Sequence, residues 1–88
     1  MPKSIELSNH AKNKITVLDD LGFKVEENEV INAIKNAESV VEGKKGRKIA
    51  QRSISERHVL RVIFEEDYIS IMVITLYPAR RERYEDQL

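Results

Sequence analysis

The chain contains no cysteine among its 88 residues. A disulfide, a thiolate nucleophile and a cysteine-based zinc site are therefore excluded, and packing has to stabilise the fold. Long apolar runs are missing as well, because the longest one, at 71–74, is far shorter than the roughly 20 residues that a membrane-spanning helix needs. The first residues also lack an apolar stretch of signal-peptide length. We expect a soluble, cytoplasmic protein that does not enter a membrane.

Charge is balanced in number but not in position. The fifteen Lys and Arg residues cancel the fifteen Asp and Glu residues. Residues 18–42, however, hold seven acidic and two basic side chains, whereas residues 43–61 hold seven basic and one acidic. Such segregation produces a local positive field that attracts a phosphate-bearing or acidic partner, although a solvated surface explains any single lysine.

The apolar spacing of the N-terminal half predicts an edge strand at 4–7 and two amphipathic helices. Ser8 or Asn9 caps the first helix, and Gly22 ends it. The second helix begins in an acidic turn that suits the positive end of a helix dipole. Neither helix is long enough to be stable alone, so both need a sheet to pack on. The expected buried residues are Ala11, Ile15, Leu18 and Leu21 in the first helix, and Val30, Ile31, Ile34 and Ala37 in the second.

After residue 39 the apolar period changes from about 3.6 to 2, which is the change expected where helices give way to strands. Strands are predicted at 40–41, 47–54, 58–65 and 68–77, with turns at 43–46, 55–57 and 66–67. The strand at 68–77 is apolar on both faces, which predicts that it is the central strand. Pro78 is expected to end this strand, because proline cannot donate to the ladder. The chain is short and has no repeat or linker, so we predict one domain over 1–88. Its fold class is α+β, with two N-terminal helices packed on an antiparallel sheet.

Few groups are suited to metal or phosphate chemistry. His10 and His58 are far apart and lack the spacing of a metal site, so we predict no metal and no cofactor. The glycine-bracketed segment 43–46 lacks the GKS or GKT ending of a nucleotide-binding loop. We interpret both histidines as partly buried, hydrogen-bonded groups rather than as catalytic ones.

Arginines and one tyrosine make up the remaining constellation. Arg61 stands inside a predicted strand, where a guanidinium needs a carboxylate or an anionic ligand, and both interpretations stay open. The last strand is followed by Arg80, Arg81, Arg83 and Tyr84. Arginine forks hold a phosphodiester, and a tyrosine stacks on a base or donates a proton. This tail therefore suits RNA binding or cleavage, unless it is simply solvated.

These segments together resemble the RelE/ParE superfamily of toxins. The similarity lies in HVLRVIFEED at 58–67, VITLY at 73–77 and RRERY at 80–84. Members carry an arginine in the penultimate strand, an acidic hairpin, an apolar last strand and a basic tail with a tyrosine. The N-terminal half, with its histidine-alanine pair at 10–11, resembles a RelE-like branch, and the tail is similar to that of BrnT-type toxins.

The resemblance implies the toxin of a toxin–antitoxin pair, a metal-independent endoribonuclease that cleaves mRNA on the ribosome and is neutralised by a cognate antitoxin. By position, Arg61 would contact the phosphate, Arg81 or Arg83 would stabilise the transition state, and Tyr84 would stack or donate a proton. The same fold also serves noncatalytic ParE-like protein-binding modules, so a homologue without activity is the alternative. The implied RNA-binding residues are Lys44, Lys45, Arg47, Lys48, Arg52 and Arg80.

Overall fold

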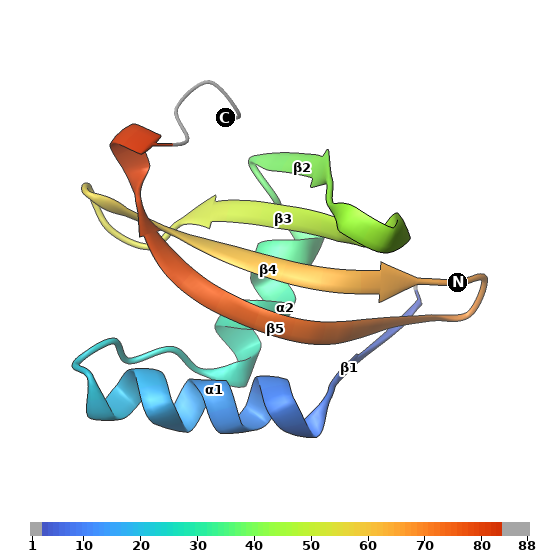
Figure 1. Ribbon diagram of the computed structural model, residues 1–88, viewed down its shortest axis with the longest axis horizontal. Coiled ribbons are helices and arrows are strands. Elements are labelled where there is room, and N and C mark those ends of the chain that lie inside the picture. Colours follow the sequence, from blue (N-terminus) through green and yellow to red (C-terminus); the bar gives the residue numbers. More distant parts are fainter. Residues whose placement is uncertain (1–2, 84–88) are drawn as a thin grey trace.

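The fold of residues 3–83, which a computed structural model describes, is α+β, as the sequence predicts (Figure 1). These residues form two helices, five strands and two short 3-10 turns, η1 and η2. None of the helices in this part of the chain has the length and apolarity to cross a membrane. In chain order the elements are β1 (Ser4–Leu7), α1 (Asn9–Asp20), α2 (Glu27–Lys35), β2 (Ser39–Glu42), η1 (Lys44–Gly46), β3 (Lys48–Ser53), β4 (His58–Glu66), β5 (Ser70–Arg80) and η2 (Arg81–Arg83).

The sheet is mixed, whereas the sequence predicted an antiparallel one. Its strand order is β1-β5-β4-β3-β2, and β2 to β5 form an antiparallel meander. β1 lies parallel to the first residues of β5, with Ile5 opposite Ile71. The predicted central strand is also corrected, because β4 is central and the longer β5 lies one place from the edge. Alternation shows that a segment is a strand, but it does not show which strand lies beside it.

Pro78 lies inside β5 and does not end it, which corrects a further prediction. The amide of Arg81 donates to the carbonyl of Arg57 at 2.8 Å, which identifies the hydrogen-bonded pairs of the antiparallel ladder. By alternation Leu60 and Pro78 form a non-hydrogen-bonded pair, so the proline nitrogen points away from β4. β1 does not reach this part of β5, and no ladder hydrogen bond is lost.

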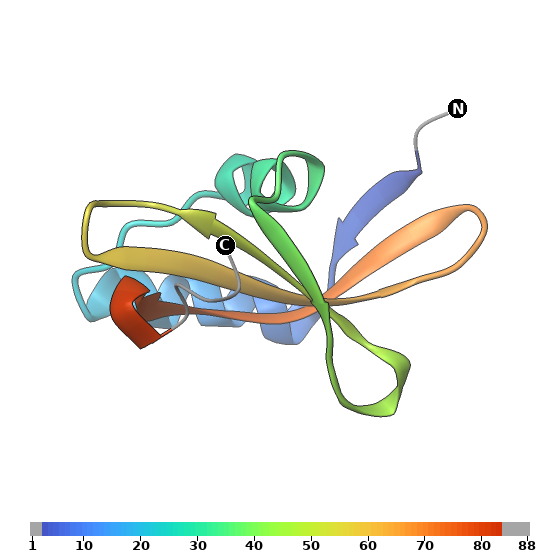
Figure 2. The ribbon, with the colours of Figure 1, turned by 90° about the horizontal axis from the view of Figure 1, so that it is seen from above.

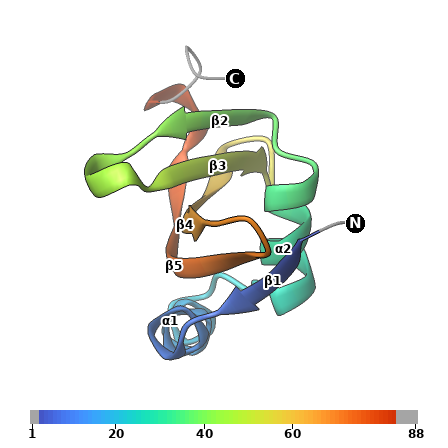
Figure 3. The same ribbon diagram turned by 90° about the vertical axis from the view of Figure 1, so that its right-hand side faces the viewer.

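Both helices pack on one face of the sheet. Figure 3 shows α1 next to β5, and α2 alongside β3 and β4. The predicted apolar stripes are confirmed in part: Leu21 is 70% exposed, because α1 ends at Asp20 and Gly22 turns the chain with φ +93°. Ala33 is buried instead of the half-buried Ile31. The main core comprises Ala11, Leu18, Val25, Val30, Ala33, Leu60, Val62, Val73 and Leu76.

The hydroxyl of Ser8 joins α1 to the sheet. It accepts from the amide of Ala11 at 3.0 Å, which is the expected N-cap, and donates to the carbonyl of Ile74 at 3.1 Å. Ile74 is the extra residue of a β-bulge, because Ile63 pairs with Thr75 while the next residue of β4 pairs with Val73. The start of α1 is therefore held at the point where β5 changes register.

Candidate functional site

The sheet face opposite the helices carries two cross-strand rows of different chemistry. Successive side chains of a strand point to opposite faces, so residues paired with one another share a face. Leu60 and Val62 face the helices, which places Arg61 and Ile63 on the other face. The polar row is Ser39, Gln51, Arg61 and Tyr77, and the apolar row is Val41, Ile49, Ile63 and Thr75.

Arg61 is held in the middle of the polar row. Its Nε donates to the hydroxyl of Tyr77 at 3.0 Å, and its Nη1 donates to Oε1 of Gln51. Arg61 is 4% exposed and Gln51 is 1% exposed. A ligand would therefore meet this guanidinium only if it became exposed, and its hydrogen bonds fix side chains from β3, β4 and β5.

Three arginines and a histidine surround a pocket at the end of the sheet where β4 begins and β5 ends. His58 pairs with Arg80, and the backbone bond between Arg81 and Arg57 extends this pairing by one residue. The pocket has a volume of about 390 Å³. We call it the arginine pocket; its lining residues are Glu56, Arg57, His58, Arg80, Arg81 and Glu82.

The ring of His58 is oriented by the loops beside it. Phe23, which follows α1, lies edge-on to the imidazole with 5.5 Å between the ring centroids. Oγ of Ser55 lies 3.5 Å from Nδ1 and accepts the His58 amide at 3.1 Å. His58 is thus partly buried and hydrogen-bonded, as predicted, and it also lines the arginine pocket. The same prediction is wrong for His10, which is exposed on α1. The sequence pattern did not predict this placement, because it depends on the pairing of β4 with β5, although Arg57 next to His58 was a signal of a basic site.

The charges around the arginine pocket are only partly compensated. Nη1 of Arg80 lies 3.6 Å from Oε1 of Glu82, but both side chains are more than 70% exposed, so this pair contributes little. The positive charge of Arg81 also acts on Glu38. Hydrogen bonds from Ser53 lower the pKa of Glu38 most, and Arg81 and Arg52 lower it further.

The residues predicted to bind RNA do not form one patch. Lys44 and Lys45 lie in η1, beside the end of β4 remote from His58, whereas Arg80 ends β5 and lines the arginine pocket. Figure 2 shows the same separation, with the β2–β3 loop and the β4–β5 turn at one end and η2 at the other. Four of the six have partners: Arg47 pairs with Glu65 at 3.0 Å, Lys48 with Glu66 at 3.1 Å, Arg52 donates to the carbonyl of Asn36 at 2.7 Å, and Arg80 forms the exposed pair with Glu82.

Two predicted catalytic groups fall outside the described structure. The backbone of Arg83 ends η2, but its side chain and the whole of Tyr84 lie outside the described residues. Within residues 3–83, no group of three or more His, Cys, Asp and Glu side chains is placed to hold a metal ion. Comparisons of the chain with protein-family models, with curated proteins and with solved structures find no match.

Proposed function

We propose that this protein is a RelE/ParE-like toxin, a metal-independent endoribonuclease that cleaves mRNA at the arginine pocket and is neutralised by an antitoxin. The observation that carries the proposal is that three arginines and an oriented histidine line one pocket at the end of the sheet. Arginine is suited to phosphate because its planar fork donates two parallel hydrogen bonds. Histidine is the commonest general acid–base residue.

The reaction proposed for the pocket is attack of a ribose 2′-oxygen on the adjacent phosphorus. The 2′-hydroxyl proton passes to the imidazole of His58, and the bond from phosphorus to the 5′-oxygen breaks as that oxygen takes up a proton. The products are a 2′,3′-cyclic phosphate and a 5′-hydroxyl. Arg57, Arg80 and Arg81 stabilise the additional negative charge on the phosphorane oxygens.

Arg61 has a positioning role in this proposal. The resemblance assigned it a phosphate contact, but a side chain that is 4% exposed is better suited to supporting the site from below. Its bond to Tyr77 holds β5 three residues before Arg80. Arg83 and Tyr84 keep the roles that the resemblance implies and are additional candidates for charge stabilisation and proton transfer.

The test is to incubate the purified protein with translating ribosomes and to map the mRNA ends. His58→Gln and Arg81→Ala should each lower the cleavage rate by about 10²–10³ while the far-ultraviolet circular dichroism is unchanged. Lys12→Ala, on the exposed side of α1, is the matched control for loss of a surface cation and should cleave at the wild-type rate. If both pocket variants produced the same mRNA ends at the same cleavage rate as the wild type, the arginine pocket would not be the catalytic site.

A noncatalytic, ParE-like protein-binding module is the second candidate. This candidate is favoured by three cations that already have partners within the fold and not in RNA, namely Arg47, Lys48 and Arg52. In that case expression is toxic although no mRNA end changes. If the wild-type protein produces no cleavage with ribosomes, the enzyme proposal fails and this second candidate replaces it.

A further inference from the structure

A second hollow lies on the helix-free face, near the end of the sheet opposite to the arginine pocket. It has a volume of about 700 Å³, and it lies between the β2–β3 loop and the apolar row of the sheet. Ile49 and Ile63, which are direct cross-strand partners, form its floor. We call this hollow the loop groove; the residues around its floor are Glu42, Gly43, Lys44, Lys45 and Arg47.

The floor of the loop groove is aliphatic and incompletely covered. Ile49 and Ile63 are half-buried, and the row continues to the half-buried Val41 on β2. Burying such side chains against a ligand is favourable by about 25 cal/mol per Å² of apolar surface. The floor offers no aromatic ring or guanidinium plane on which a nucleic-acid base could stack. It is therefore suited to an aliphatic side chain and poorly suited to single-stranded RNA.

The rim is a loop held in one conformation. The Gly43 amide donates to the Arg47 carbonyl at 2.7 Å, and the Arg47 amide donates to the Lys44 carbonyl at 3.2 Å. A Cβ atom on residue 43 would lie 3.2 Å from the Arg47 carbonyl oxygen, so the glycine allows the two backbone segments to approach this closely. Lys45 has φ +58°, a conformation that costs a residue with a Cβ about 1 kcal/mol or more. The loop is thus preorganised, with strain at one of its lysines.

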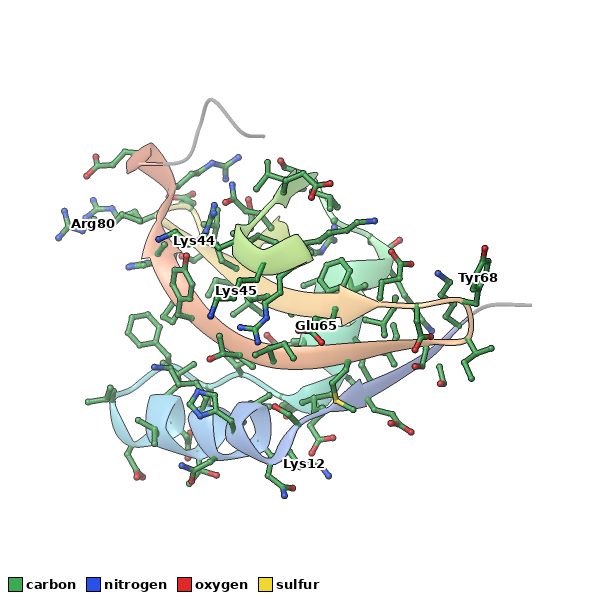
Figure 4. The ribbon with its side chains drawn as sticks, turned by 45° about the vertical axis from the view of Figure 1, so that its right-hand side comes forward. Lys12, Lys44, Lys45, Glu65, Tyr68 and Arg80 are labelled. Atoms are coloured by element: carbon green, nitrogen blue, oxygen red, sulfur yellow. The ribbon has the colours of Figure 1, made fainter. Side chains whose placement is uncertain are left out.

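The rim has positive charge that the fold does not neutralise. Arg47 is paired with Glu65, but Lys44 and Lys45 are exposed and form no ion pair with any residue between 3 and 83. Both project from the loop in front of the sheet (Figure 4). We propose that the loop groove binds an acidic amphipathic segment of a partner protein. An aliphatic side chain of that segment rests on Ile49 and Ile63, and its carboxylates lie beside Lys44 and Lys45.

This inference is independent of RNA cleavage at the arginine pocket. The test uses the ¹⁵N-labelled protein and three probes: a dodecapeptide with two leucines among glutamates, the same peptide with lysines for glutamates, and oligouridylate. The acidic peptide should shift the amides of residues 43–49 and 63, with a dissociation constant of about 1 mM or tighter, and should leave those of 57–58 and 80–81 unmoved. The lysine peptide should bind at least about tenfold more weakly.

Two variants separate the contributions of rim and floor. The double substitution Lys44→Glu and Lys45→Glu should lower the affinity for the acidic peptide by at least about tenfold and raise that for the lysine peptide. Ile49→Gln should weaken the binding of both peptides. Unchanged amide resonances in the rest of the spectrum would show that the fold persists. No shift at residues 43–49 with saturating acidic peptide, equal binding of both peptides, or preferential binding of oligouridylate at these amides would each overturn the inference.

Discussion

Replacing Arg61 tests whether this buried guanidinium serves the fold or the ligand. Arg61→Met keeps a long apolar stem but removes the donors to Gln51 and to the Tyr77 hydroxyl. Both acceptors lie within the sheet face, and Gln51 is 1% exposed, so water cannot replace the lost donor there without rearrangement. We expect the variant to fold but to be clearly less stable than the wild type.

The magnitude is worked from the two hydrogen bonds that Arg61 forms within residues 3–83. A hydrogen bond to a charged group contributes about 1.5–3 kcal/mol, and a buried acceptor that loses its donor costs about 1–3 kcal/mol. Because the methionine stem restores part of the packing, we expect Arg61→Met to lower the free energy of unfolding by about 2–3 kcal/mol. Arg61→Ala also leaves a void, and we expect it to cost about 1 kcal/mol more. These are large fractions of the roughly 5–10 kcal/mol expected for a domain of this size.

The change in the free energy of unfolding is measured by urea unfolding followed by circular dichroism. The slope m shows whether the variant and the wild type unfold in comparable transitions. Tyr77→Phe is the matched control, because it removes one hydroxyl acceptor and should cost about 1 kcal/mol. The double variant should show a coupling energy of about 0.5–1.5 kcal/mol between Arg61 and Tyr77. The positioning role is wrong if the free energy of unfolding of Arg61→Met lies within about 0.5 kcal/mol of the wild-type value while mRNA cleavage falls about 100-fold. That result would show that Arg61 contacts the substrate.

Four further outcomes are expected. Leu60→Ala should cost about 2–4 kcal/mol in urea unfolding because Leu60 is fully buried, whereas Tyr68→Ala, at a 99% exposed position, should stay within about 0.5 kcal/mol; equal losses would contradict the described core. Ser8→Ala should cost about 1–2 kcal/mol through loss of the α1 cap and the bond to β5, and an unchanged midpoint would show that neither bond matters. The amides of Ile69 and Ser70 donate to Asp67 and hold its pKa below the ordinary value, so its contribution to stability is present above the unfolded pKa and is lost as pH falls through the lower folded value; Asp67→Asn should flatten the acid limb of stability below about pH 4. In the proposed mechanism arginines supply the charge stabilisation, so dialysing the protein against EDTA before it is added to the ribosomes should leave mRNA cleavage unchanged, and a loss restored by treating the protein with metal ion would contradict this mechanism.

Much of the local structure was predictable because it depends on neighbours in the chain. The edge strand at 4–7, the Ser8 cap and the two helices follow from spacing and capping preferences, and all are observed. The alternation in β4 also predicted that Leu60 and Arg61 point to opposite faces. It could not predict that the polar face would close over Arg61, because that depends on which side chains β3 and β5 place beside it.

The arginine pocket was harder to predict, and the reason is register. The sequence placed the last turn at 66–67 and ended the last strand at Pro78, whereas β5 begins at Ser70 and continues to Arg80 with one bulge. The later turn and the bulge both slide β5 along β4. Only the observed register sets His58 opposite Arg80, and so joins two basic segments that are 22 positions apart in the sequence.

The sequence by itself determined the α+β class, the order of the elements and the alternation of faces along β4, because period and capping are properties of short segments. The tertiary structure alone decided that β1 lies parallel to β5, that β4 is central and that Arg61 is buried among polar side chains. It also decided that some of the predicted basic residues lie at the arginine pocket and others at the loop groove. These features depend on strand pairing between distant segments, which is selected by the packing of the whole core and not by any one pattern along the chain.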